Sequence, residues 1–280
     1  MSTPTGSPTS RLSINQATTE TSSTPVLLDA CAQTGVGFVA PWRHKYIDDD
    51  AATTRCALDE RGIRASSLCR GGFFTGTRPE AEAAADNRRA VEEAAELGAP
   101  VLVLVCGPVT VAGAPAALDA ITRGIEELLP HAIEHDVVLA VEPFHPMFAA
   151  ERSAIVRLDQ ATDLVTKVDH PNLGIAVDTY HVWWDPDLPA ALERACARTV
   201  SVHVADWLVP TASLLQGRGL PGDGIIDLPA ILGTLARGGY GGHVEVEVLN
   251  ADVWARPAVD VVRDVQHRMA PLLEGTGSAA

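Results

Sequence analysis

The chain has few basic residues, and it lacks the cysteine pairs that mark a disulfide framework or a structural zinc site. Its 280 residues carry 21 Lys and Arg against 36 Asp and Glu, a formal net charge of -15. Nucleic-acid binding depends on clustered basic side chains that release counterions, so this balance argues against a nucleic-acid partner. The five cysteines are scattered and have no CxxC spacing, so we expect free thiols in a reducing cytoplasm.

Long apolar segments and targeting signals are also lacking. The longest apolar run, Pro100 to Cys106, is far shorter than the about 20 residues that cross a bilayer. The first ten residues, MSTPTGSPTS, are rich in Ser, Thr and Pro, and no apolar segment follows them. We therefore expect a soluble cytoplasmic protein with a disordered tail at residues 1–10 and no membrane partner.

The sequence does contain a regular alternation of short β-rich runs and longer segments with helical spacing. The eight predicted strands are Leu12–Thr18, Val36–Pro41, Ala65–Cys69, Val101–Cys106, Val137–Glu142, Leu173–Asp178, Val200–Ala205 and His243–Leu249. The predicted helices are Thr24–Thr34, Asp48–Arg61, Pro79–Leu97, Ala116–His135, Ser153–Val168, Asp187–Arg198, Asp227–Arg237 and Pro257–Leu273. Hydrophobic residues make up 46% of the chain, enough for a sizeable core.

This alternation, over a length near the barrel norm of about 250 residues, predicts one (β/α)8 TIM barrel of the α/β class spanning residues 11–280. An open doubly wound sheet is the competing fold. It would need a glycine-rich phosphate turn after the first strand, and the residues there, NQATT at 15–19, do not form one.

Four consecutive predicted strands end in polar side chains that face the barrel interior. Neighbouring side chains of a strand point to opposite faces, so an outward Val141 turns Glu142 inward, and Val202 and Val204 bracket an inward His203. Barrel enzymes place their chemistry at the C-terminal ends of strands. We therefore expect one cluster made of Glu142, Asp178, His203 and Glu247.

Three carboxylates and an imidazole buried together would repel each other and lose hydration, and a divalent cation removes this conflict. The oxygen-rich set suits Mn2+, with Mg2+, Co2+ and Zn2+ as alternatives. Each residue taken alone is more often an ion-pair partner, a loop cap or a core histidine, so their shared placement carries the prediction. Glu245 lies one layer deeper, and we expect it to pair with a polar interior group such as Asn15 or Arg70.

These residues resemble the xylose isomerase-like TIM barrel superfamily, in particular its sugar isomerase/epimerase group. The resemblance covers essentially the whole chain after the tail, and its strongest motifs are Glu142-Pro143, Asp178-Thr179-Tyr180-His181, Val202-His203-Val204-Ala205-Asp206 and the GYGG run at 239–242 leading to Glu247. It implies that Glu142, Asp178, His203 and Glu247 bind one divalent metal, usually Mn2+.

The resemblance also implies a reaction. Glu142 and Glu247 would exchange a proton next to a carbonyl of a sugar, through a metal-stabilised enediolate. Glu247 is selected over Glu245 because it lies seven residues after Tyr240. His181 and Arg218 match positions that contact substrate oxygens, although the glycine-rich loop around Arg218 is also consistent with a plain surface connection.

His145 departs from the ordinary epimerase pattern. Phe144 and Pro146 would hold it rigidly and partly desolvated, which lowers the pKa and favours a neutral general base; a loop histidine facing water is the simpler alternative. This stretch resembles the catalytic subunit of C-glycoside deglycosidases, in the same superfamily. That resemblance implies a lyase that cleaves 3-oxo C-glycosides by β-elimination, with His145 as the base and a small second subunit as partner.

Two further substrate contacts are predicted at strand ends. Arg70 follows the third strand and Trp183 the sixth, and each is equally consistent with loop packing. The expected ligand is a small sugar or sugar conjugate, and the absence of a compact basic site favours one without phosphate.

We expect a homo-oligomer, or a complex with a small second subunit if the chain is a deglycosidase. A DNA-repair branch of the superfamily is disfavoured because the third and fourth strands end without histidine.

Overall fold

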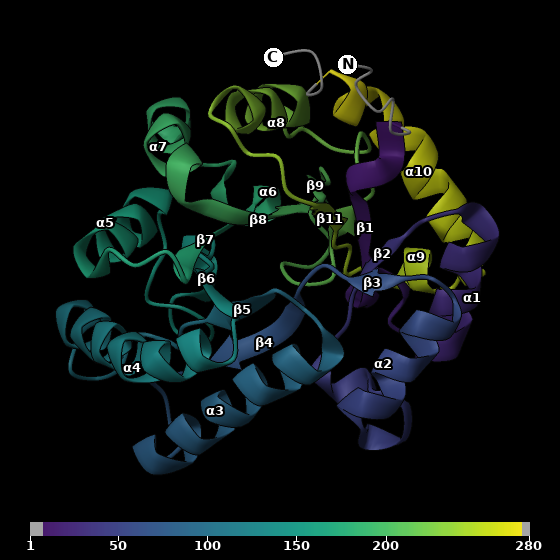
Figure 1. Ribbon diagram of the computed structural model, residues 1–280. Coiled ribbons are helices and arrows are strands. Elements are labelled where there is room, and N and C mark those ends of the chain that lie inside the picture. Colours follow the sequence, from purple (N-terminus) through teal and green to yellow (C-terminus); the bar gives the residue numbers. More distant parts are fainter. Residues whose placement is uncertain (1–7, 276–280) are drawn as a thin grey trace, which may run out of the picture.

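The computed structural model describes residues 8–275, in which a ring of parallel strands is enclosed by helices (Figure 1). One nine-stranded sheet runs in the order β3-β2-β1-β11-β8-β7-β6-β5-β4. A parallel bridge between Trp42 and Cys69 links the two ends of this sheet, and Cys69 N donates a hydrogen bond to Pro41 O at 3.1 Å. The strands therefore form the closed α/β TIM barrel that the alternation predicts.

The strands and main helices follow the predicted order. The barrel strands are β1 (Leu12–Asn15), β2 (Phe38–Ala40), β3 (Arg64–Ala65), β4 (Leu68–Gly72), β5 (Val101–Val105), β6 (Val138–Val141), β7 (Leu173–Asp178), β8 (Thr199–Val204) and β11 (Val244–Val246). The long helices are α1 (Thr24–Thr34), α2 (Ala51–Glu60), α3 (Glu80–Leu97), α4 (Ala114–Glu134), α5 (Leu158–Val168), α7 (Leu188–Ala195), α8 (Leu228–Arg237) and α10 (Ala258–Glu274).

Nine strands fill the eight positions of the barrel because β3 and β4 are two pieces of the predicted third strand. β3 pairs with β2, and β4 pairs with β5. The predicted run Ala65–Cys69 is thus interrupted between Ala65 and Leu68, and the register of β4 with β5 shifts between Cys69 and Gly71.

Side-chain parity separates two apolar layers. Val103, Ala140 and Ala176 belong to a small cluster inside the barrel. Val141 and Ile175 belong to the large core between the strands and the helices. Residues of opposite parity thus face opposite sides, which confirms the inward and outward assignment used to predict the cluster of polar residues.

Short elements in the loops after the strands were not predicted. They are α6 (Thr179–Val182), α9 (Ala251–Trp254) and an antiparallel pair of β9 (Asp206–Trp207) with β10 (Arg218–Gly219). The predicted helix Ser153–Val168 begins later, at Leu158. Ser153 instead forms a β-bridge with Gly107, and the Gln160 side chain accepts hydrogen bonds from the backbone at the start of α5.

The start of the chain also differs from expectation. Of the expected tail at residues 1–10, residues 1–7 lie outside the described part. Pro8–Arg11 form a 3₁₀ helix, so the described structure begins within the expected tail, and Arg11 Nε, just after it, donates to Gly242 O at 2.8 Å. The five cysteines are free, as predicted. Within residues 8–275, no helix has both the length and the apolar character needed to span a membrane.

Candidate active site

The four predicted ligands meet at the C-terminal end of the barrel. Their elements are neighbours in the sheet: Glu142 follows β6, Asp178 ends β7, His203 lies in β8 and Glu247 follows β11. All four are buried, and one ligand atom from each lies within 4.8 Å of the others. The predicted convergence is confirmed. That the four bind a metal stays a prediction.

The donor set fits a divalent cation. His203 Nδ1 lies 3.1 Å from Glu142 Oε1 and 3.4 Å from Glu247 Oε2. Ligands of one octahedral ion with bonds of about 2.1 Å are about 3 Å apart, so these separations need little change on binding. Three buried carboxylates with one imidazole favour a hard or borderline cation, and they place more negative than positive charge in the centre.

A helix cap orients Asp178. Its Oδ1 accepts a hydrogen bond from Tyr180 N at 2.9 Å, which caps the N-terminus of α6. The second oxygen, Oδ2, is then left for the centre, where Arg218 Nη1 donates to it at 2.9 Å. The run from Asp178 to His181 therefore fixes both a ligand and the short helix that carries His181.

Glu245 lies behind His203. The two residues are register partners across β11 and β8, and Glu245 Oε2 is 3.3 Å from His203 Nε2. A proton on Nε2 that is shared with this carboxylate leaves the Nδ1 lone pair for a metal. Burial lowers the pKa of His203, but the surrounding carboxylates, Glu245 first, outweigh it and raise the pKa. Asn15 and Arg70 were the two expected partners of Glu245, and the structure shows the first of these contacts. Asn15 Nδ2 donates to Glu245 Oε2 at 3.5 Å.

Arg218 lies inside the cluster. It is 3% exposed, and its Nη1 donates to Asp178 Oδ2 at 2.9 Å and to Glu247 Oε2 at 3.3 Å. The β9–β10 pair places Arg218 opposite Trp207, and the Asp206 carboxylate accepts hydrogen bonds from three backbone amides that shape this loop. In the structure Arg218 supplies a positive charge beside two predicted metal ligands. That it also contacts substrate stays a prediction.

The two glutamates differ electrostatically. Burial raises the pKa of Glu142 to about 7, although the neighbouring His203 opposes the shift. Burial also acts on Glu247, but Arg218 and His203 outweigh it and lower the pKa of Glu247 to about 2. Arg218 contacts Glu247 and not Glu142, and this asymmetry separates two side chains of the same type.

His181 has a buried proton donor without a partner. Burial lowers its pKa to about 3, so the ring is neutral, and it stacks on Phe144 with ring centroids 4.1 Å apart. Arg218 can only donate, so His181 Nε2, at 3.3 Å from Arg218 Nη2, is an acceptor and Nδ1 carries the proton. Within residues 8–275 this Nδ1 has no hydrogen-bond partner. Such a donor suits a substrate oxygen.

His145 is half-buried in an aromatic group. Its Nδ1 accepts a hydrogen bond from Met147 N at 3.2 Å, so in the neutral ring Nε2 carries the proton, and burial lowers the pKa of His145, as predicted. The ring stacks on Trp207, with ring centroids 5.4 Å apart.

Trp207 is a residue that the sequence analysis missed as a candidate, although it directly follows the motif Val202-His203-Val204-Ala205-Asp206. It also stacks on Tyr180, with ring centroids 4.6 Å apart. Trp183 lies 5.1 Å from Trp207 and lines a surface cavity of about 360 Å³ beside α7 and α8.

Arg70 lines a separate cavity of about 280 Å³ at the rim of the barrel, beside Trp42 and His44. Its guanidinium lies 4.4 Å from the centre of the Phe73 ring. Burial and the charges of nearby arginines, Arg152 first, lower its pKa. Within residues 8–275 Arg70 forms no ion pair, so its charge remains available for a ligand.

Fold and site together define a class of protein: a barrel with a buried, acid-rich centre at the C-terminal ends of its strands. The chain belongs to the xylose isomerase-like TIM barrel family, whose sequence pattern matches residues 28–269.

Known proteins resemble this chain over most of its length. A Streptomyces coelicolor protein named as a hydroxypyruvate isomerase is 26% identical over an alignment of 261 positions that covers 81% of this chain and 87% of that protein. A solved structure from Sinorhizobium meliloti 1021 has a TM-score of 0.89 and 40% identity, covering 94% of this chain and 98% of that one. The IolI protein, solved with a zinc atom, has a TM-score of 0.81 at 21% identity over 96% of this chain and 99% of its own.

Proposed function

We propose that the protein is a divalent-metal-dependent isomerase or epimerase that moves a proton on the carbon next to a carbonyl of a small hydroxylated substrate. The observation that carries this proposal is the buried convergence of Glu142 and Glu247 with Asp178 and His203. The relative named as a hydroxypyruvate isomerase supports the reaction class. We favour Mn2+ for the donor set, and the zinc atom in the IolI structure supports Zn2+ as the alternative.

The chain's own residues supply the proton transfers. The metal, when bound by the four ligands, supplies positive charge that stabilises negative charge on the substrate carbonyl oxygen. Glu247, which its low pKa keeps ionised, takes the proton from the adjacent carbon, and the electron pair of the C–H bond moves toward the carbonyl oxygen. Glu142, whose raised pKa of about 7 leaves it partly protonated near neutral pH, returns a proton. Its return to the same carbon gives the epimer, whereas its return to the neighbouring carbon gives the isomer. His181 Nδ1 donates a hydrogen bond to a substrate oxygen.

A second candidate is the lyase reaction, in which His145 takes the proton and a phenolic aglycone leaves a 3-oxo C-glycoside with the electron pair. The lowered pKa of His145 favours it, because a base must be neutral at pH 7. Since Nδ1 accepts from Met147 N, Nε2 carries the proton in the structure, so this reaction requires the other tautomer of the ring. This candidate includes the small second subunit as a partner.

The test begins with protein stripped of metal and reloaded with Mn2+, Mg2+, Co2+ or Zn2+. Each form is incubated in deuterated water with hydroxypyruvate, free ketoses, inosose or a 3-oxo C-glycoside. Deuterium in an isomer or epimer supports the proposal, and release of the free aglycone supports the lyase. Failure of every substrate with every metal would overturn both.

We expect His145→Ala to separate the two reactions. Proton exchange by the two glutamates should change less than about tenfold, whereas elimination should fall by about 10² to 10⁴-fold, as for loss of a general base. The measurement is the initial rate of each product. His267→Ala, an exposed histidine on α10, is the control. Equal losses in both reactions would contradict the assignment of His145 to elimination alone.

We expect Arg70→Met to raise KM for a substrate that carries a carboxylate. The unpaired guanidinium would bind that group, and a hydrogen bond to a charged group contributes about 1.5–3 kcal/mol, roughly 10 to 150-fold. The effect on an uncharged analogue should be small. Arg64→Met is the matched control, because Arg64 also lies over an aromatic ring, Phe38, but at the other end of the barrel. Equal KM changes for charged and uncharged substrates would exclude this role.

A further inference from the structure

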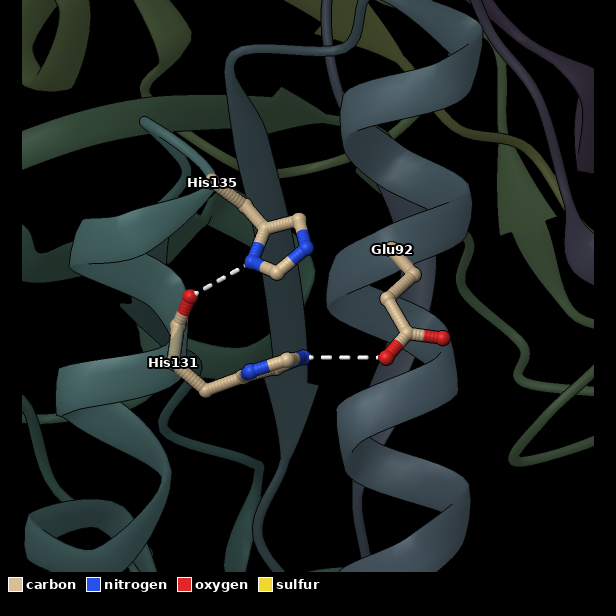
Figure 2. A group of neighbouring side chains, drawn as sticks. All are labelled: Glu92, His131 and His135. Carbon is tan, nitrogen blue, oxygen red and sulfur yellow. Dashed lines mark hydrogen bonds and ion pairs between the residues drawn. The ribbon is translucent and has the colours of Figure 1, made fainter.

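Three side chains with metal-binding groups meet between α3 and α4, outside the active site (Figure 2). Glu92 lies on α3, His131 lies in the last turn of α4, and His135 caps its C-terminus. Helices of a TIM barrel run back from the C-terminal ends of the strands, so the end of α4 lies at the opposite rim. This cluster is therefore separate from the buried centre around Glu142.

The spacing of the three groups suits one ion. One ligand atom from each residue lies within 4.8 Å of the others. His131 Nε2 is 3.2 Å from Glu92 Oε1. Tetrahedral zinc with bonds of about 2.0–2.1 Å holds its ligands about 3.3 Å apart, so these two atoms already have the separation of two ligands of one zinc ion.

The tautomer of His135 is fixed in the form that binds metals. Its Nδ1 lies 2.9 Å from the backbone oxygen of His131, and a carbonyl oxygen only accepts, so Nδ1 carries the proton. The lone pair is then on Nε2, which Figure 2 shows on the side of the ring that faces Glu92. A backbone carbonyl on the other ring nitrogen is the usual support of a metal-bound histidine.

A simple hydrogen bond between the two helices accounts for only part of this arrangement. It explains His131 and Glu92, but it leaves His135 Nε2 without a protein partner among residues 8–275. The two imidazole rings are also close, with centroids 4.3 Å apart. A cation is favoured there by the carbonyl groups at the end of α4 and by Glu134, whose Oε2 is 3.9 Å from His131 Nδ1.

We propose that Glu92, His131 and His135 bind a second divalent ion, which joins α3 to α4. Two imidazoles and one carboxylate favour Zn2+, with water in the fourth position. The site is partly exposed, so the ion can enter from solvent. Because it lies at the rim opposite the active site, we assign it a structural role that does not depend on the proposed reaction.

The test counts zinc ions per chain by calorimetric titration of metal-free protein. We expect two sites in the wild type, one in His135→Ala, one in the active-site variant Glu142→Gln with Asp178→Asn, and none in the combination. A site counts as lost when its Kd rises at least tenfold. His267→Ala should retain both sites. A second readout is the imidazole NMR signals of His131 and His135, which should shift when zinc is added to the active-site variant.

The outcomes separate this site from the active site. Equal zinc stoichiometry in the wild type and in His135→Ala, with no change in the two imidazole signals, would overturn the second site. Loss of zinc only from the Glu142→Gln, Asp178→Asn protein would support the active site alone. Glu92→Gln, at a more exposed position, provides an independent variant that should also lose one ion if the proposal holds. His135→Ala should retain the reaction rate of the wild type.

Discussion

Glu142→Gln is expected to reduce proton exchange by at least about 10³-fold. The substitution keeps the shape of the side chain but removes the carboxyl oxygen that would hold a metal and carry a proton, and loss of a general acid or base alone costs about 10² to 10⁴-fold. His203 Nδ1, 3.1 Å from Glu142 Oε1, would lose its charged neighbour. The measurement is deuterium incorporation at saturating metal, together with the Kd for Mn2+, which should rise at least tenfold.

Reduced stability of the fold should not be the cause of the slower proton exchange in Glu142→Gln. A buried carboxylate is costly to desolvate, and Gln removes that cost, so the metal-free variant should be at least as stable as the metal-free wild type. Denaturant unfolding in the presence of a chelator checks this. Glu126→Gln, at an exposed position on α4, is the control for the chemical change. Exchange at the wild-type rate in Glu142→Gln would exclude Glu142 from the reaction.

The centre could be predicted because strand parity is a short-range rule. Val141, Val177 and Val204 point outward into the large core, so the polar residues beside them in sequence had to face the interior. Closure of the barrel then brings neighbouring strand ends together, whatever the loops do. This argument needs no knowledge of the loops, and it placed Glu142, Asp178 and His203 correctly.

The loops could not be predicted in the same way. The place of Arg218 depends on a short antiparallel pairing with Trp207 and on backbone amides that bind the Asp206 carboxylate. Arg218 and Trp207 are 11 positions apart, and two of the amides, those of Gly222 and Ile226, are 16 and 20 positions from Asp206, so these contacts follow no periodic pattern. The cluster of Glu92 with His131 also depends on how two helices lie side by side, which single-sequence patterns do not define. The sequence therefore located the ligands but not the groups that position them.

Arg218→Met is expected to destabilise the metal-free protein by about 3–5 kcal/mol. The guanidinium is buried, bonds to Asp178 and Glu247, and lies 4.7 Å from the centre of the Tyr180 ring. Met fills similar space without a charge, so two buried carboxylates would lose their cation, and an uncompensated buried charge costs this much. Urea unfolding in the presence of a chelator measures the loss. A divalent ion in the same centre would restore part of it, so Mn2+ should stabilise the variant more than the wild type.

Arg268→Met provides the matched control because Arg268 also bonds to two carboxylates, Asp223 and Asp264, but near the surface. Its loss should cost only about 0–1 kcal/mol, the usual contribution of exposed ion pairs. The loss in Arg218→Lys should fall between these values, since a single ammonium keeps the charge but lacks the second nitrogen, Nη2, that contacts His181. If Arg218→Met were no more destabilising than Arg268→Met, the buried acids would not depend on Arg218. If Mn2+ then stabilised both variants equally, Arg218 would have no electrostatic link to the metal centre.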